Sequence, residues 1–130
     1  MQKDYWEWHK VKSKLNDRRN SPKFFKPREI WYIACGLNVG REQDGRGQSF
    51  RRPILILHKF SQETFWGIPL TTKEKKHDLF FPLNIKDNKG SWAMIAQLKL
   101  FDSKRLIQRI DKIDPINFYA IKEKIRMLLV

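Results

Sequence analysis

The stretch from Gly40 to Leu57 places the strongest constraint on the fold, because in it a polar loop passes directly into an unbroken apolar run. The loop ends at Arg52, Pro53 follows, and the run Ile54–Leu57 contains no polar residue. Such a run is typical of a strand that is buried on both faces and has neighbours on each side. Pro53 has no N–H to donate, so we expect it at the first position of the strand. The sequence therefore predicts a sheet with a central strand at 54–58.

Other short segments rich in apolar and aromatic residues are separated from this strand by turn residues. We expect further strands at 30–35, 64–69, 79–85, 92–100 and 106–112. Pro82 should lie at a sheet edge or a bulge, since a central position would lose a ladder hydrogen bond. Five or six short strands in a chain of this length predict a small, strongly curved antiparallel sheet or a partly open barrel.

Helical signals appear near the end of the chain. A short helical turn is expected at 102–104, and a longer helix should start with Asp114 as its cap and Pro115 at its first position. The apolar residues of this helix recur at helical spacing and form one face, made of Phe118, Ile121, Ile125 and Leu128. The predicted fold class is therefore mainly β with helices (α+β).

Residues 1–27 have the character of an appendage, and residues 28–130 that of a single domain, as expected for a chain of 130 residues. The appendage carries an apolar stripe at helical spacing, made of Tyr5, Trp8, Val11 and Leu15. We expect a short extra helix there. A stripe of this kind is more often a packing face than a surface for stacking bases.

The charge of the chain points to an anionic partner. Lysine and arginine number 27 against 14 aspartate and glutamate, which leaves a net charge of +13. Nucleic acid, an acidic protein or an anionic membrane surface would each be attracted. No apolar run approaches the roughly 20 residues of a spanning helix, and the first 25 residues contain no apolar signal core. We therefore expect a cytoplasmic protein that does not enter a membrane.

Residues that could hold a metal or form a disulfide are sparse. Cys35 is the only cysteine, which excludes an intramolecular disulfide and a cysteine-based zinc site. The three histidines are scattered singly, without metal-ligand spacing. A free cysteine at the end of an apolar run usually packs as a small hydrophobic residue. We expect no cofactor.

Metal-free cleavage of RNA would suit a basic chain of this kind, because RNA supplies its own nucleophile in the 2′-hydroxyl. The protein then needs a base for that proton, a cation for the charge that develops on phosphorus, and an acid for the leaving oxygen. Arg52 offers a rigid fork of donors to phosphate oxygens, and its place before Pro53 restricts its backbone. Glu42, in the preceding loop, is a candidate base.

Hydroxyl groups at the end of a strand could bind the same phosphate. Thr71 and Thr72 follow the predicted strand 64–69. If this strand pairs antiparallel with the strand that begins near Arg52, the two threonines lie near the arginine. Threonines at this kind of position more often satisfy a turn. Gln97 and Lys99, with Lys104 and Arg105, would line another edge, either as contacts to the substrate or as a solvated basic face.

Several motifs stand together in a specific order: Arg28-Glu29-Ile30-Trp31, Gly40-Arg41-Glu42-Gln43, Arg52-Pro53-Ile54-Leu55-Ile56-Leu57, Ile68-Pro69-Leu70-Thr71-Thr72, Ser91-Trp92-Ala93-Met94-Ile95-Ala96-Gln97 and Asp102-Ser103-Lys104-Arg105-Leu106. In this order they resemble the MazF/PemK family of toxins from bacterial toxin–antitoxin pairs. The resemblance covers about residues 28 to 129.

This resemblance implies a homodimeric SH3-like barrel that acts as a metal-independent, sequence-selective endoribonuclease on single-stranded RNA. The products would be a 2′,3′-cyclic phosphate and a 5′-hydroxyl. A cognate antitoxin with an acidic, largely disordered tail would be the protein partner, and the pair would bind DNA. The arginine that precedes proline in the family corresponds to Arg52 and the strand-end hydroxyl to Thr71, while the Glu-Gln loop pair corresponds to Glu42 and Gln43. Arg41 precedes this pair and is a further candidate for binding the substrate.

Two departures from the family pattern affect these expectations. Many relatives have an acidic residue immediately before the glutamine of the late strand, whereas this chain has Ala96, which excludes a base there and favours Glu42. The insertion Arg46–Phe50 and the extra N-terminal segment could alter the choice of RNA or the binding of a partner.

Two alternative functions are compatible with the same fold. One is a gyrase poison of the CcdB kind, which blocks its target through the C-terminal helix. Those poisons have a tryptophan near the C-terminus, whereas this chain ends Met127-Leu128-Leu129-Val130, and the sequence disfavours that function. The other is a non-catalytic nucleic-acid-binding module in which the basic loop positions RNA.

Overall fold

The computed structural model describes residues 24–34, 51–73, 77–86 and 88–130. The predicted N-terminal helix, Cys35, the insertion 46–50 and the loop with Arg41, Glu42 and Gln43 lie outside the described residues. In chain order the elements are β1 (Glu29–Ala34), β2 (Arg51–Lys59), β3 (Thr64–Thr71), β4 (Phe80–Ile85), β5 (Asn88–Met94), the 3-10 turn η1 (Ile95–Gln97), β6 (Lys99–Asp102), the 3-10 turn η2 (Ser103–Arg105), β7 (Leu106–Lys112) and α2 (Pro115–Leu128).

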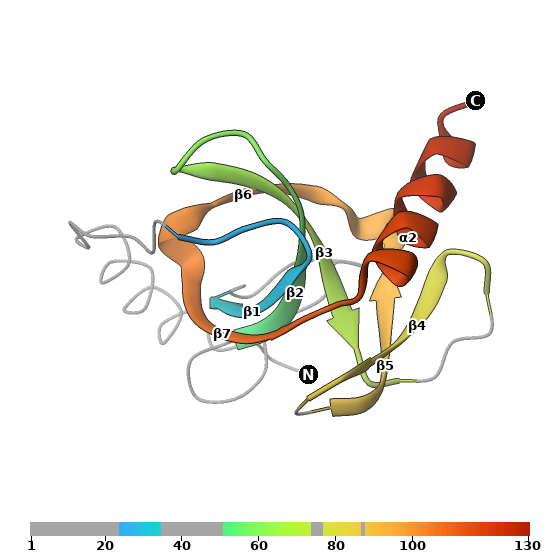
Figure 1. The fold of residues 1–130 in the computed structure, drawn as a ribbon, viewed down its shortest axis with the longest axis horizontal. Coiled ribbons are helices and arrows are strands. Elements are labelled where there is room, and N and C mark those ends of the chain that lie inside the picture. Colours follow the sequence, from blue (N-terminus) through green and yellow to red (C-terminus); the bar gives the residue numbers. More distant parts are fainter. Residues whose placement is uncertain (1–23, 35–50, 74–76, 87) are drawn as a thin grey trace, which may run out of the picture.

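The strands form one antiparallel sheet that curls on itself. Its order is β4-β5-β3-β2-β1-β7, and β6 pairs with the first half of β3. In Figure 1, β7, β1, β2, β3 and β6 curve around a common interior, while α2, β4 and β5 lie together on one side. The fold is therefore mainly β, a curled antiparallel half-barrel with a C-terminal helix, as predicted. Pro82 lies on β4, at the end of the sheet order, which confirms its predicted edge position.

Alternate residues of β2 pack into two different hydrophobic clusters, which explains why its sequence is apolar without interruption. Ile54 and Ile56 join a cluster with Phe65 and Phe101 on one face of the sheet. Leu55 and Leu57 join the cluster that includes Ile121 of α2 on the other face. Since successive side chains of a strand point to opposite faces, β2 is the layer between the two clusters. Its prediction as a strand buried on both faces is confirmed.

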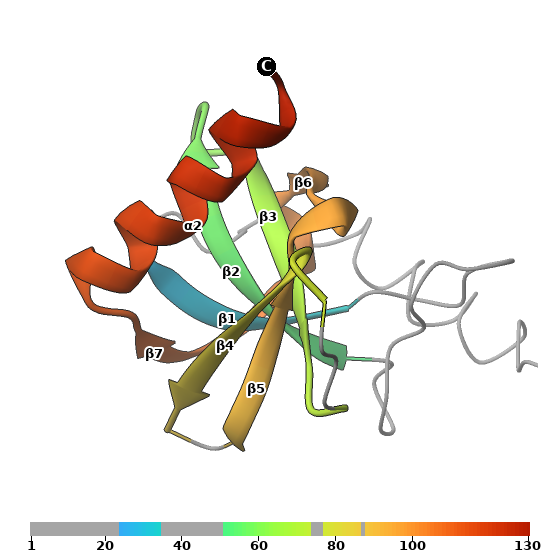
Figure 2. The ribbon, with the colours of Figure 1, turned by 90° about the vertical axis from the view of Figure 1, so that its right-hand side faces the viewer.

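The C-terminal helix begins as predicted and covers one face of the sheet (Figure 2). The backbone N–H of Asn117 donates to a carboxylate oxygen of Asp114 at 3.0 Å, and this bond lowers the pKa of the Asp114 carboxyl. Pro115 occupies the first turn. Of the four residues predicted to pack, Leu128 does not, because it lies in the last turn with 55% of its surface exposed.

The predicted strand 92–100 is wrong as a single element, because it is broken after Met94 by η1. β5 pairs Leu70 with Ala93, and β6 pairs Gly67 with Lys99. The chain thus takes six residue steps (93 to 99) along three steps of β3 (67 to 70). No continuous strand can stay in register over such an excess, so the 3-10 turn takes up the extra residues.

Two further comparisons concern the start of β2 and the turn before β7. Pro53 is the third residue of β2, because Arg51 and Arg52 already pair with β1. Proline is compatible with this place because β3 pairs with β2 only from Ile54 onward, so no ladder donor is needed on that side. The predicted helical turn at 102–104 is confirmed as η2, where Asp102 accepts a hydrogen bond from the N–H of Lys104 at 2.8 Å.

Candidate active site

Arg52 is a buried cation held by the neighbouring strand. Only 5% of its surface is exposed, and its Nη1 donates to the carbonyl oxygen of Leu70 at 3.1 Å. A buried guanidinium requires hydrogen-bond partners. One partner of Arg52 is a backbone oxygen of β3. The bond fixes the position of the Arg52 side chain next to the end of β3. Pre-positioning of Arg52, which was expected from Pro53, therefore also depends on the partner strand.

Thr71 is the last residue of β3 and is 8% exposed. Its Oγ1 accepts a hydrogen bond from the backbone N–H of Lys73 at 3.3 Å, so the threonine does satisfy the turn that follows the strand. A hydroxyl oxygen that accepts one bond still has its own proton to donate. Thr71 can therefore stabilise the turn and donate to an anionic oxygen at the same time.

The pairing of β2 with β3 brings these two residues to the same place. Ile54 lies opposite Pro69, so the same register extended by two residues places Arg52 opposite Thr71. Side chains two residues apart in a strand share a face. The predicted proximity of Arg52 and Thr71 is therefore supported by the register and by the bond from Arg52 to the carbonyl of Leu70.

Of the other predicted residues in the described part of the chain, one lies beside Thr71, and two lie farther along β3. Thr72 directly follows Thr71 and is exposed. Gln97 lies in η1 and Lys99 starts β6 opposite Gly67, which is four residues before Thr71. At about 3.3 Å per residue this separates Lys99 from Thr71 by about 13 Å along β3. Lys99 is exposed, and its Nζ lies 5.4 Å from the ring centre of Phe101.

Two further arginines lie near Arg52. From the sequence, Arg51 had no predicted role, and Arg105 was predicted at another edge, together with Gln97 and Lys99. Arg51 pairs with Ala34 at the end of β1, and its guanidinium lies 5.3 Å from the ring centre of Tyr32. Arg105 donates from Nη1 to the carbonyl oxygen of Ala34 at 2.8 Å. Arg51, Arg52 and Arg105, called here the arginine cluster, therefore lie around the ends of β1 and β2, with the side chain of Arg51 on the opposite face of β2 from that of Arg52. Arg105 is distant in sequence, so only the pairing of β7 with β1 reveals its place.

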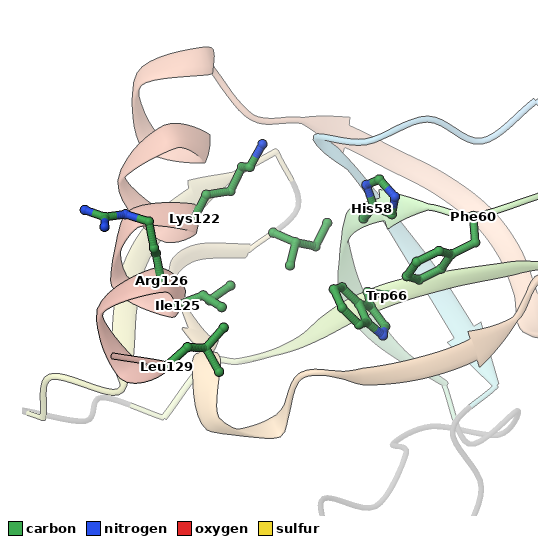
Figure 3. A pocket seen from close by; sticks show the side chains of 8 residues that line it. His58, Phe60, Trp66, Lys122, Ile125, Arg126 and Leu129 are labelled. Carbon is green, nitrogen blue, oxygen red and sulfur yellow. The ribbon is translucent and has the colours of Figure 1, made fainter.

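A separate apolar groove lies between α2 and the β2–β3 hairpin (Figure 3). It has a volume of about 310 Å³ and is lined by Leu57, His58, Phe60, Trp66, Lys122, Ile125, Arg126 and Leu129. His58 and Trp66 lie opposite each other, far along β2 and β3 from Arg52 and Thr71. The groove is therefore a second surface, outside the candidate active site.

The charges at the rim of this groove are coupled along α2. Arg126 donates from Nη2 to a carboxylate oxygen of Glu123 at 2.8 Å. This hydrogen bond lowers the pKa of the Glu123 carboxyl and raises the pKa of the Arg126 guanidinium. Both side chains are exposed to water, so the pair contributes little to stability.

Within residues 24–34, 51–73, 77–86 and 88–130, no group of three or more His, Cys, Asp or Glu side chains is placed to hold a metal ion. None of the helices described there is long and apolar enough to cross a membrane.

The chain was compared with known families and structures. The family model of the PemK-like, MazF-like toxin of type II toxin–antitoxin systems matches residues 26–129. None of the curated proteins matches the sequence. Among solved structures, a MazF (Form-I) from Deinococcus radiodurans is 16% identical with a TM-score of 0.63, covering 85% of this chain and 97% of that one.

Two other solved structures have the same fold. The Mycobacterium tuberculosis toxin MazF-mt6 is 17% identical with a TM-score of 0.62, covering 78% of this chain and 96% of that one. An endoribonuclease in complex with its cognate antitoxin, from a mycobacterial species, is 11% identical with a TM-score of 0.58, covering 79% of this chain and 92% of that one. At these identities the structures establish the fold of the chain, while the family model spans most of its length.

Proposed function

Because the chain belongs to the PemK-like, MazF-like toxin family of type II toxin–antitoxin systems, we propose that it is a metal-independent endoribonuclease that cleaves single-stranded RNA. The observation that carries this proposal is the position of Arg52 and Thr71 at facing strand ends, with Arg51 and Arg105 close by. This arrangement offers fixed donors and positive charge to a phosphate, as expected for a site that stabilises charge developing on phosphorus.

In the proposed reaction the 2′-oxygen of a ribose attacks the adjacent phosphorus, and the bond from phosphorus to the 5′-oxygen breaks. Glu42 takes the proton from the 2′-hydroxyl, and a water molecule donates a proton to the leaving 5′-oxygen; the hydroxide that remains then takes the proton from Glu42. Arg52 stabilises the negative charge on the phosphorane, while Thr71 donates to one of its oxygens. The guanidinium keeps its proton at any working pH, so its part is electrostatic. The products are a 2′,3′-cyclic phosphate and a 5′-hydroxyl.

Further residues are proposed to hold the RNA rather than to react with it. Arg41 and Gln43 belong to the same loop as Glu42, and their assignment rests on the family motif. Thr72 adjoins Thr71, whereas Gln97 and Lys99 lie farther along the same edge of β3 and would contact nucleotides more distant from the cleaved bond.

The proposed partners follow from family membership and charge. We propose a homodimer in the cytoplasm, inhibited by an acidic antitoxin that the net charge of +13 would attract. Complexes of this kind are known among the structural neighbours, which include a MazE-MazF pair from Deinococcus radiodurans. Together with its antitoxin, the protein would bind DNA.

The deciding experiment is cleavage of a long single-stranded RNA by the purified full chain in excess chelator, followed by analysis of both new ends. Cyclic phosphate on one fragment and a 5′-hydroxyl on the other are expected. Arg52→Ala, prepared in the same way, serves as the control for a contaminating nuclease and should cleave at least about 100-fold more slowly. Intact RNA with the folded wild-type chain would contradict the proposal and favour a gyrase poison or a non-catalytic binding module.

A further inference from the structure

We infer that Trp92 is a stacking platform for a base of the RNA, beside the phosphate that Arg52 and Thr71 hold. The inference rests on the proposed function, because it concerns how that site holds its substrate. It adds a residue from a third strand to the site, and none of the family motifs considered above assigns a role to this side chain.

The register places Trp92 directly beside Thr71. The two residues are Cα partners across β3 and β5, and the next pair is Leu70 with Ala93. Leu70 and Ala93 both belong to the hydrophobic cluster that contains Ile121 of α2. Because side chains alternate along a strand, Thr71 and Trp92 point to the opposite face. Directly opposed side chains have Cβ atoms about 4.5 to 5.5 Å apart, so the indole adjoins the hydroxyl.

Trp92 differs from the other two described tryptophans in what its ring contacts. Trp31 donates from Nε1 to a carboxylate oxygen of Glu29 at 3.1 Å, and Trp66 packs edge-on against Phe60 with ring centres 4.9 Å apart. Within the described part of the chain, Trp92 takes part in no comparable ring or side-chain hydrogen-bond contact, although it remains partly exposed. The printed contacts therefore account for the rings of Trp31 and Trp66, whereas the distinguishing feature of Trp92 is its partly exposed position beside Thr71.

A base is the chemical group that best fits this position. Adjacent strands are about 4.8 Å apart, so a phosphate between Arg52 and Thr71 lies within one nucleotide of the Trp92 ring. Stacking on an aromatic ring accepts every base, because each base has a π-face. Trp92 would therefore raise the affinity for single-stranded RNA, while the choice of sequence would depend on other contacts. Duplex RNA, whose bases are already stacked, would gain nothing from it.

The inference predicts that Trp92→Leu raises KM for a cleaved single-stranded RNA by about tenfold or more while kcat changes little. Trp92→Phe keeps an aromatic face and should stay close to wild type. Trp66→Leu, a partly exposed tryptophan at the other end of β3, is the matched control and should leave both constants unchanged. The affinity is measured separately by fluorescence anisotropy with an RNA carrying a 2′-O-methyl group at the mapped cleavage position.

The outcomes separate this inference from the proposed function. If wild type cleaves RNA and a folded Trp92→Leu binds it within about twofold of wild type, the stacking role is wrong and the proposed function stands. If wild type neither binds nor cleaves RNA, both fail. A fall in kcat with unchanged KM would assign Trp92 a structural part in the site and also overturn the inference.

A second measurement uses the unmodified chain, so it does not depend on how well a variant folds. RNA in which 5-bromouridine replaces uridine is irradiated in complex with the wild-type protein, and the crosslinked peptide is identified by mass spectrometry. A crosslink at Trp92 is expected, because stacked bromouracil reacts with the ring that it covers. Crosslinks that map only to other residues would overturn the inference.

Discussion

At the scale of single residues, the two donors of the site are fixed by different means. Arg52 uses one arm of its guanidinium on the carbonyl oxygen of Leu70. Thr71 uses its oxygen as an acceptor for Lys73 and retains its proton. Both side chains are nearly buried, so neither has to be ordered when a substrate arrives. Their substitution should therefore change the chemical step more than the binding of RNA.

Arg52→Lys should lower kcat by about tenfold or more, and Arg52→Ala by at least about 100-fold, with a smaller rise in KM. A lysine has the charge but lacks the planar fork that reaches the Leu70 carbonyl and a phosphate together. Both constants are measured on a mapped RNA. Arg51→Lys, at the exposed neighbouring position, is the control, and an equal loss there would show that general charge near β1 matters rather than Arg52 itself.

Thr71→Val should reduce kcat by about 100-fold, because it removes one donor to the phosphorane while keeping the shape of the side chain. Thr71→Ser keeps the hydroxyl and should retain most of the activity. Thr64→Val changes a threonine at the other end of β3 and should leave cleavage unchanged. Equal rates for the serine and valine variants would exclude the hydroxyl from the reaction.

At the scale of secondary structure, local sequence signals predicted where strands and helices begin better than where a strand is interrupted. Pro53 with its apolar run indicated β2, and Asp114 with Pro115 indicated the start of α2. The interruption at η1 has no such signal, because Trp92 to Leu100 is mostly apolar, with no glycine or proline, and the excess residues exist only relative to β3. A mismatch between two strands is a property of their pairing, and the sequence of either strand alone does not contain it.

The Asp114 cap should make the stability of α2 depend on pH. Its pKa is lowered in the folded chain, so the carboxylate contributes stability above its unfolded value of about 3.9, and this contribution is lost as pH falls through the lowered folded pKa. Asp114→Ala should therefore lower Tm more at pH 7 than at pH 3. Asp114→Asn keeps a capping oxygen and should remain close to wild type at pH 7. A Tm difference between wild type and Asp114→Ala that is independent of pH would contradict this assignment.

Gly67 lies at a close contact between β3 and Ile54 of β2. A methyl group on Gly67 would lie 2.5 Å from Cδ1 and 2.9 Å from Cγ1 of Ile54. Gly67→Ala should therefore lower the free energy of unfolding by about 1 to 3 kcal/mol, measured with urea. Adding Ile54→Val, which deletes Cδ1, should return part of that loss. Simple additivity of the two changes would show that the clash lies elsewhere.

At the scale of the whole molecule, positive charge and strand pairing together define the site. The resemblance in sequence identified Arg52 and Thr71, since both belong to ordered motifs. Arg105 also belongs to one of these motifs, but its place beside Ala34 exists only because η2 and β7 return to the end of β1. Glu42 stays a prediction, because it lies outside the described residues. The two proposed donors thus come from short motifs, whereas the position of Arg105 near them comes from the fold.

Binding of single-stranded RNA should weaken steeply with salt. If the arginine cluster neutralises three phosphates, the slope of log affinity against log salt is about −2, or about 20-fold between 0.1 and 0.4 M. Anisotropy titrations with a non-cleavable RNA measure the slope. Arg51→Gln, at an exposed member of the cluster, should make it less steep by about 0.7. A slope near zero in wild type would mean that the cluster does not meet the RNA backbone.

The central position of β3 has a consequence for how the site can respond to its substrate. β3 is bonded to β2 along one edge and to β6 and β5 along the other, and Thr71 ends it between these neighbours. Strands enclosed in this way open on the slowest timescales of a domain, so their amide hydrogens exchange last. RNA therefore meets a hydroxyl that is already in place and cannot reshape it. Tolerance for different nucleotides must come from parts of the molecule that lie beyond this strand.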